Sequence, residues 1–546
     1  MSTAKGRLRS IRRGVQTAFL LLFFYLILRT AQPLEVRIPV NIFLRSSPVL
    51  AITAMLSARA FMAVFLPALI VLALTLAFGR VFCGWVCPFG TTLDASDRFL
   101  SKFRRKKSSD AAVQPPYHTV KYALLAVLVI SAIFGLQVAG WFDPICIATR
   151  TYGIAMYPYF NFVGEHTLRW ARGTNLLPGL VSWLDQVAHQ SVLALRQPVY
   201  RADLLFLLTF IVIALFGLLE RRFWCRHLCP LGAVLDVVSR VSFLRRRVRD
   251  GCTNCLRCQR SCKMGAITGS GERTFRGECI ECFTCDAVCP EGVSTFAFSG
   301  DKAQREKSAG LTRRGFVAAI VGGVAAVPVL RTNFARSRGL LRFLRPPGVD
   351  DEEEFLAECV RCGACVKVCI TAGLQPALLE AGPEAMWTPK LVPRVGYCEY
   401  NCTLCGRVCP TQAIPQLSEA EKHEAIIGTA FFDRNRCIPW AENRNCAVCE
   451  EVCPTPTKSI VLRDTGLKDE VTGEPLRRPH VRADVCIGCG VCEYKCPLPG
   501  RAGILVGPIR YPEQRRRQRA GGRGAGRRAR RRRGRVSFQG ADEFTR

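Results

Sequence analysis

Histidine is scarce in this chain, with six residues in 546. No C-x-x-C-H motif occurs, which argues against covalently attached haem c. So few histidines leave little for a haem held by two of them; His118 and His227 are the ones near ends of predicted helices. Acidic residues are also few, 43 against 76 basic ones, and the net charge is +33. Much of this excess flanks apolar segments, which indicates membrane orientation before nucleic-acid binding.

Cysteine, in contrast, is abundant. The chain has 29 cysteines, and 24 of them lie in six tight runs of four. Neighbours two or three residues apart in one run cannot easily form a disulfide with each other without strain. The spacing is therefore that of metal or cluster ligands rather than of a secreted disulfide scaffold.

The first two runs read C-x2-C-x2-C-x3-C, the bacterial ferredoxin pattern whose fourth cysteine ligates the other cluster of a pair. Three thiolates on one wrapping loop can bind three corners of a [4Fe–4S] cubane, and the fourth points to a neighbouring cluster. We therefore expect two clusters with exchanged ligands. One is held by Cys252, Cys255, Cys258 and Cys289, and the other by Cys279, Cys282, Cys285 and Cys262.

Four further runs follow in a second block. They are Cys359, Cys362, Cys365 and Cys369; Cys398, Cys402, Cys405 and Cys409; Cys437, Cys446, Cys449 and Cys453; and Cys486, Cys489, Cys492 and Cys496. Structural zinc is the alternative for any single run, but zinc sites more often use two separated Cys/His pairs. The sixfold repeat, with proline after four of the runs, predicts six [4Fe–4S] clusters and iron as the metal.

Four apolar stretches, at residues 14–31, 61–80, 119–140 and 203–220, approach the roughly 20 residues that a membrane helix needs. Buried helices of a soluble protein are the alternative. Basic groups precede the first stretch and follow the second and fourth. The positive-inside rule makes their side cytoplasmic, and the loops 32–60 and 141–202 then face outward.

Two shorter cysteine motifs follow the second and fourth apolar stretches. Each reads C-x3-C-P, with Cys83 and Cys87 in the first and Cys225 and Cys229 in the second. Residues i and i+4 share one helix face, so the four thiols could meet at one metal, cluster or redox site. Packing of small buried cysteines is the alternative.

With these motifs in view, residues 14–289 resemble the NapH- and MauN-type membrane ferredoxin component of quinol dehydrogenases. Residues 310–506 resemble the NapG- and MauM-type ferredoxin partner. The chain thus looks like a fusion of the two. The resemblance implies a quinol substrate and electron delivery to a periplasmic reductase, as in a nitrate-reductase-type respiratory chain. It also implies that in 351–506 the outer two runs exchange ligands with each other, as do the inner two.

The linker L-T-R-R-G-F-V at 311–317 fits a twin-arginine export signal ahead of the apolar run 315–330. No convincing cleavage site follows, so we interpret the run as a fifth, uncleaved span; an amphipathic cytoplasmic linker is the alternative. The predicted domains are a four-helix membrane domain (1–250), a two-cluster module (251–300), the linker (301–350), a four-cluster module (351–510) and a disordered Arg-rich tail (511–546).

The sequence therefore predicts an α-helical membrane domain of four helices plus an anchor helix, joined to two α+β ferredoxin-like modules. It sits in the bacterial inner membrane, with 252–300 in the cytoplasm and 351–546 in the periplasm. Its expected partners are lipid, quinone and a soluble reductase or cytochrome, without nucleic acid, and with homo- or hetero-oligomers open. Asp94, Glu220 and His227 are the candidate proton acceptors for quinol oxidation. The competing hypothesis is a redox-sensing regulator or a metal-centre maturation protein.

Overall fold

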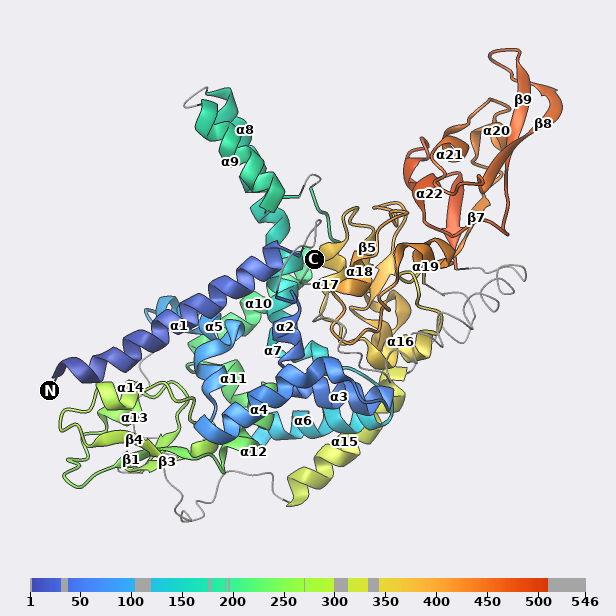
Figure 1. The fold of residues 1–546 in the computed structure, drawn as a ribbon. Helices are drawn as coiled ribbons and strands as arrows, with labels where there is room; N and C mark the ends of the chain where they lie inside the picture. Colours follow the sequence, from blue (N-terminus) through green and yellow to red (C-terminus); the bar gives the residue numbers. More distant parts are fainter. Residues whose placement is uncertain are drawn as a thin grey trace, which may run out of the picture.

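The computed structural model describes residues 2–30, 38–103, 119–174, 178–191, 193–194, 197–269, 271–298, 313–331 and 343–508. Three predicted features lie outside these residues: His118, the tail at 511–546 and two parts of the linker, 301–312 and 332–342. The described chain forms a helical part followed by two cysteine-rich modules, which Figure 1 shows in green and in yellow to red.

The helical part runs to residue 239 and consists of one long helix followed by shorter ones, and its apolar core continues into the second module. Its elements are α1 (Ser2–Leu28), α2 (Ile42–Arg45), α3 (Pro48–Ala58), η1 (Ala63–Phe65), α4 (Leu66–Phe78), η2 (Phe82–Val86), α5 (Pro88–Leu100), α6 (Val120–Ile133), η4 (Ala139–Trp141), α7 (Pro144–Arg150), η5 (Thr151–Met156), α8 (Tyr157–Gly173), α9 (Pro178–Ser191), α10 (Asp203–Leu215), η6 (Phe216–Leu218), α11 (Phe223–His227) and α12 (Pro230–Ser239).

Each of the four predicted apolar stretches forms a helix, but three of these helices are shorter than predicted. Among the described residues, one helix, at Arg7–Leu28, is long and apolar enough to cross a membrane. The others are α4, α6 and α10, which have 13, 14 and 13 residues, so a four-helix membrane domain is not confirmed. The helices shorten because glycine ends two of these stretches, at Gly79 and Gly135, each with a positive φ.

The first module holds seven short elements around its cysteines. These are β1 (Leu244–Val248), α13 (Arg257–Ser261), β2 (Ile267–Thr268), β3 (Arg273–Thr274), η7 (Arg276–Glu278), α14 (Thr284–Ala287) and β4 (Ser294–Phe298). β1 pairs antiparallel with β4, with Leu244 opposite Phe298. The module therefore begins seven residues before the predicted boundary at 251, because three consecutive arginines in β1 resemble a basic loop and only the pairing makes them a strand.

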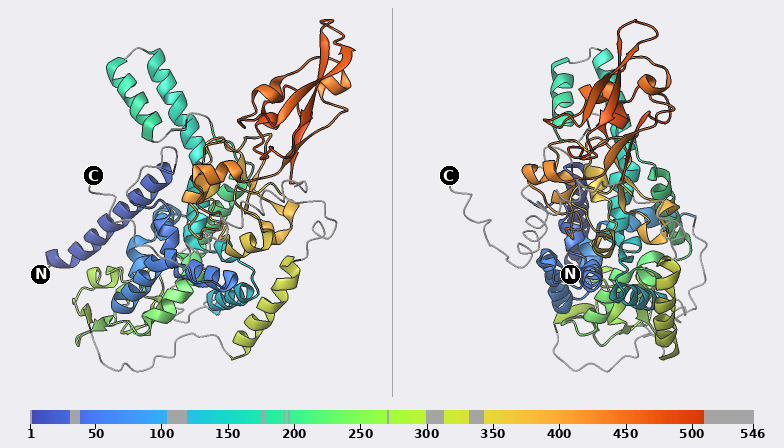
Figure 2. Two further views of the ribbon diagram at one scale, coloured as in Figure 1. Left: turned by 45° about the vertical axis from the view of Figure 1, so that its right-hand side comes forward. Right: turned by 90° about the vertical axis from the view of Figure 1, so that its right-hand side faces the viewer.

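The second module is larger and has an elongated tip. Its elements are α16 (Glu352–Glu358), α17 (Ala364–Val368), β5 (Leu374–Pro376), η8 (Leu379–Ala381), η9 (Pro383–Ala385), β6 (Pro389–Leu391), α18 (Leu404–Arg407), α19 (Glu419–Glu424), β7 (Thr429–Phe432), α20 (Ile438–Ala441), α21 (Val448–Glu451), β8 (Ile460–Lys468), β9 (Pro475–Val481), α22 (Val491–Lys495) and β10 (Ile504–Gly507). β5 pairs with β6, β7 with β10, and β8 with β9. Both views in Figure 2 show the red β8–β9 hairpin at the top, at the end of the second module away from its yellow and orange part.

The two modules contact the helical part at the two ends of α6. At the start of α6, Lys121 forms an ion pair with Glu278 of the first module. Shortly after its end, Gly140 lies against Val360 of the second module. The helix that links the modules, α15 (Arg313–Arg331), packs along α6, and the Arg331 side chain donates a hydrogen bond to the Phe134 carbonyl (2.7 Å). α15 thus runs from the side of the first module to the side of the second.

Candidate metal centres

The first module brings its eight cysteines together in two sets of four. One cavity is lined by Cys252, Cys255, Cys258 and Cys289. The other is lined by Cys262, Cys279, Cys282 and Cys285, beside Met264, Ile280 and Phe283. Each set takes three thiols from one run and the fourth from the other, which is the exchange that the spacing predicts.

The second module exchanges ligands differently from the prediction. One cavity is lined by Cys398, Cys402 and Cys405 with Cys369 of the preceding run. Another is lined by Cys437, Cys446 and Cys449 with Cys496 of the last run. The first run therefore exchanges with the second and the third with the fourth, so the predicted outer-with-outer pairing is wrong. The β7–β10 pairing explains the second exchange, because it brings the chain after Cys496 back beside the third run.

The remaining two sets follow the same rule. Burial and the neighbouring thiols of Cys362, Cys359 and Cys409 raise the pKa of Cys365 well above its usual range, so Cys409 lies beside the first run. In the same way burial, Cys486, Cys398 and Cys453 raise the pKa of Cys489 to about 12. Cys453 therefore joins Cys486, Cys489 and Cys492.

These sets suit a cluster better than a single ion. Within the described residues, no three Cys, His, Asp or Glu side chains come close enough together to bind one metal ion. Zinc would require such closeness, because four thiolates about 2.3 Å from one ion nearly touch. Thiols arranged around a wider cavity suit a cube of iron and sulfide.

Backbone amides also point at the exchanged cysteines. The Ala266 N–H donates to Cys262 Sγ (3.3 Å), the Leu374 N–H to Cys369 Sγ (3.5 Å) and the Gly503 N–H to Cys496 Sγ (3.4 Å). When bound, iron–sulfur clusters accept and release single electrons, and hydrogen bonds to the ligand sulfurs raise their potential. The chain thus supplies both the ligands and a means of tuning.

Each module contacts the helical part through the loop of one cysteine run. A Cβ atom built at Gly84 would lie 2.1 Å from the Ile280 carbonyl oxygen, and one at Gly140 would lie 1.8 Å from that of Val360. Ile280 directly follows Cys279, and Val360 directly follows Cys359. The Trp85 indole donates to the Glu281 carbonyl (3.0 Å), and Arg150 donates to that of Arg361 (2.7 Å). Both ligand loops are therefore held by backbone contacts.

The two C-x3-C-P motifs occupy equivalent positions at the contact with the first module. Cys87 is the N-cap of α5 and Cys229 is the N-cap of α12, and the thiol of each accepts a hydrogen bond from a glycine N–H three residues later. Cys83 and Cys225 both pack against Met264, Ala266 and Ile280 of the first module. The structure thus brings all four predicted thiols to one place.

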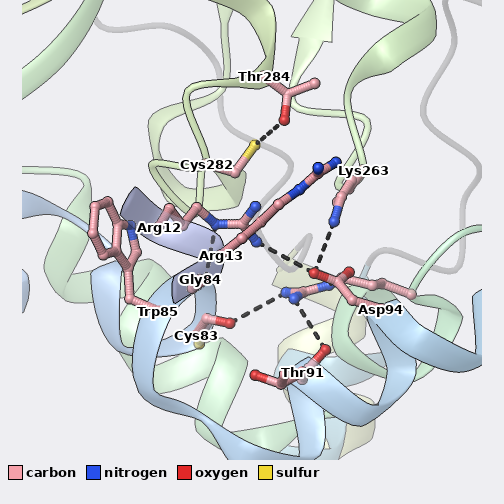
Figure 3. A network of polar contacts seen from close by, with 12 residues as sticks. Arg12, Arg13, Cys83, Gly84, Trp85, Thr91, Asp94, Lys263, Cys282 and Thr284 are labelled. Atoms are coloured by element: carbon pink, nitrogen blue, oxygen red, sulfur yellow. Dashed lines mark hydrogen bonds and ion pairs between the residues drawn. The ribbon is translucent and has the colours of Figure 1, made fainter. Parts of the chain in front are cut away.

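Of the candidate proton acceptors, Asp94 lies within a group of cations (Figure 3). Its carboxylate pairs with Arg222 at 2.7 Å, Lys263 at 2.8 Å and Arg12 at 3.3 Å. Burial alone would raise the pKa of Asp94, but Arg222 and Lys263 hold it well below its usual range. This geometry makes Asp94 an anchor for the first module rather than a base at neutral pH.

Glu220, three residues before α11, and His227, the last residue of α11, lie together. His227 is buried, and its Nε2 lies 3.1 Å from a Glu220 carboxylate oxygen, which also pairs with Arg226 at 2.8 Å. A buried imidazole next to a partly exposed carboxylate can carry a proton from the interior to the surface.

Sequence reasoning missed a buried charge network between α6, α12 and the first module. Lys121 is fully buried, lies 2.8 Å from Asp236, and also pairs with Glu278. Arg80 pairs with the same Glu278 at 3.2 Å, and the Tyr122 hydroxyl donates to Asp236. The sequence did contain one indication of this network. Lys121 stands at the start of the apolar stretch 119–140, and a lysine buried there requires an acidic partner.

Comparison with known families supports the iron–sulfur interpretation. A family described as 4Fe-4S binding domain matches residues 60–107 and again 202–249, and one described as 4Fe-4S dicluster domain matches residues 245–299. The first match covers both C-x3-C-P motifs. No solved structure matches the chain.

Several ferredoxin-type proteins are similar to this chain. The methylamine utilization ferredoxin-type protein MauM of Methylorubrum extorquens is 34% identical over 205 residues, which are 36% of this chain and 87% of MauM. The ferredoxin-type protein NapG of Escherichia coli is 36% identical over 186 residues, 33% of this chain and 78% of NapG. An uncharacterized protein of Methanocaldococcus jannaschii is 25% identical over 234 residues, 43% of this chain and 78% of that protein.

These relatives do not confirm the predicted fusion with a NapH-type part. The matches span 78–87% of the relatives and 33–43% of this chain. By this similarity the chain is an iron–sulfur protein that belongs to the family of ferredoxin-type proteins that includes MauM and NapG.

Proposed function

We propose that the chain is a membrane-bound electron carrier that passes electrons from a quinol, through [4Fe–4S] clusters held by its six cysteine quartets, to a soluble reductase or cytochrome outside the cytoplasm. The observation that carries the proposal is the contact of Val360 with Gly140. It places the ligand loop of the Cys359 run directly against the helical part, where electrons from a membrane donor would enter. The ferredoxin-type relatives support the electron-transfer part of the proposal.

The four sets of the second module lie in a row that leads away from this contact. The set containing Cys359 adjoins the one containing Cys398. Cys405 of the second set lies close enough to Cys365 of the first to contribute to its raised pKa. The Cys398 N–H donates to the Cys489 carbonyl (2.8 Å), which joins the second set to the third. Cys449 and Cys486 share one small core, which joins the third to the set at the tip. Electrons would therefore enter near Val360 and leave near Cys446.

The membrane placement rests on the two ends of α6. The first module lies at the start of α6, near Lys121, and also near the basic N-terminal segment that contains Arg12. The second module lies past the other end of α6, after Phe134. With the helices across a membrane, residues 252–300 face the cytoplasm and 351–508 the periplasm. The position of α15 along α6 supports a fifth crossing, preceded by the predicted twin-arginine motif.

Quinol oxidation releases two electrons, which two clusters can accept one at a time, and two protons. The His227–Glu220 pair is the better proton acceptor, because Asp94 is held as a carboxylate by three cations. The pair lies close to Cys225, which contacts the first module, whereas Gly140 contacts the second module. Quinol oxidised on the side of the first module would therefore supply that module, and quinol oxidised on the opposite side would supply the second.

The test uses the full chain in oriented membrane vesicles under anaerobic conditions. Addition of a reduced quinone analogue should bleach the iron–sulfur absorbance, and external protease should cut residues 351–508 only in vesicles with the periplasmic side out. Absence of bleaching with intact clusters would overturn quinol oxidation. If deletion of the gene also removed the metal centre of a partner reductase, the maturation alternative would replace it.

A further inference from the structure

The strongest feature outside the six quartets is a sequence repeat that brings four thiols together. The two segments read R-x2-C-x3-C-P-x-G, from Arg80 to Gly90 and from Arg222 to Gly232. In both, the second cysteine caps a helix, and the glycine N–H donates to its thiol, at 3.5 Å for Cys87 and 3.2 Å for Cys229. The likeness extends beyond sequence to hydrogen bonding.

The two halves also exchange their arginines. The Arg222 guanidinium donates to the carbonyls of Cys83 (3.2 Å) and Gly90 (3.1 Å) in the first half. The Arg80 guanidinium reaches into the second half, with Nη2 2.9 Å from the position of a Cβ atom at Gly232. Each arginine thus closes the opposite half, which holds both halves together as one site.

Both guanidinium groups are 1% exposed, although burial of a cation is costly unless negative charge compensates it. Asp94 and Glu278 supply part of this charge. Arg80 Nε is nevertheless a buried donor without an acceptor among the described residues. A buried unpaired donor in a site of four thiols requires an acceptor such as a thiolate or sulfide.

We infer that Cys83, Cys87, Cys225 and Cys229 together hold one additional [4Fe–4S] cluster, with Arg80 and Arg222 as its buried counter-cations. Among the described residues, no three of these thiols form a group that could hold a single metal ion. Cys87 and Cys229 are buried, and Cys83 and Cys225 are partly buried, so the site lies inside the protein. Two repeats of the family described as 4Fe-4S binding domain each contribute two of the four cysteines.

The position of the site suggests its neighbour. Cys83 and Cys225 pack against the same Met264, Ala266 and Ile280 that contact Cys262, Cys279 and Cys282. The additional cluster would therefore lie beside the cluster held by Cys262, Cys279, Cys282 and Cys285, with one layer of apolar side chains between them. This placement does not depend on the direction of electron flow or on the donor.

Iron and acid-labile sulfide per chain, measured on anaerobically purified full-length protein, test the inference. The double variant Cys83→Ala/Cys225→Ala should lose about four iron and four sulfide relative to the unchanged chain. The matched control is Cys146→Ala, which removes a fully buried cysteine outside any set of four and should lose none. Unchanged iron in the double variant, or loss of two iron or of zinc instead, would overturn the assignment.

A measurement on the unchanged chain covers the case in which the double variant misfolds. Native mass spectrometry in detergent should give a mass for seven four-iron clusters; six would overturn the inference. The variant Arg80→Met should shift the redox potential of one cluster downward, because it removes a buried positive charge. These readouts remain valid even if quinol proves not to be the donor.

Discussion

The Val360 carbonyl oxygen lies 1.8 Å from the position that a Cβ atom at Gly140 would take. Any side chain at residue 140 would therefore push the Cys359 ligand loop away from the helical part. Around this contact, the Arg150 guanidinium packs on Trp387, and the Arg361 guanidinium packs on Trp141. These exchanged cation–π contacts make the docking specific.

Gly140→Ala should accordingly slow the reduction of the second module by a membrane donor at least tenfold and leave its iron content unchanged. Stopped-flow absorbance in vesicles measures this rate. Gly179→Ala is the matched control, because nothing lies within 4 Å of a Cβ atom there. Equal rates in the two variants would mean that electrons enter the second module elsewhere.

The exchange of ligands between the first and second runs of the second module can be tested with single cysteine variants. Cys369→Ala should alter the same electron paramagnetic resonance signal as Cys398→Ala, because the two side chains line one cavity. Cys409→Ala should alter the signal that Cys362→Ala alters. If Cys369→Ala and Cys362→Ala instead changed one signal together, each run would hold its own cluster.

The buried Lys121 should be important for stability. Lys121→Met leaves Asp236 and Glu278 buried without their shared cation, which costs about 3–5 kcal/mol. Thermal loss of the iron–sulfur absorbance should occur at a markedly lower temperature. Arg172→Met breaks the exposed pair with Asp185 and should cost less than about 1 kcal/mol. Similar effects of the two variants would show that the buried network contributes little.

The ion pairs of Asp94 predict a flat pH dependence near neutrality. Its folded-state pKa is depressed, so its contribution is complete above the ordinary value of about 3.9 and is lost only as the pH falls through the lower folded value. Asp94→Asn should therefore destabilise the contact with the first module equally from pH 8 to about pH 5. A difference that faded between pH 8 and pH 6 would indicate that Asp94 titrates near neutrality.

Removal of iron should unfold the tip of the second module. Its small core consists of Ala430, Ile460 and Ile504 with Cys449, Cys486 and Cys492, so half of it is cysteine. Without clusters such a core buries too little apolar surface to remain folded. Limited proteolysis of the chelated protein should cut residues 429–507 first, before the helical part. Equal resistance of the iron-free and iron-loaded tips would contradict this prediction.

The chemistry of the chain was determined by sequence alone. Cysteine spacing predicts which three thiols of each run act together, because three residues within one short loop must lie close together whatever surrounds them. The duplicated C-x3-C-P motif, with its proline and glycine, likewise predicts two equivalent helix starts. Local geometry sets these features, and the structure places them as expected.

Tertiary structure decided how the runs combine. The partner of Cys369 depends on which loops pack together, and the exchange with Cys398 rather than Cys486 follows from contacts that spacing does not encode. The strand at 244–248 exists only through its pairing with β4. Arg80 and Arg222 become part of the thiol site only when the two repeats face each other, because each arginine serves the opposite half across more than 130 residues of chain.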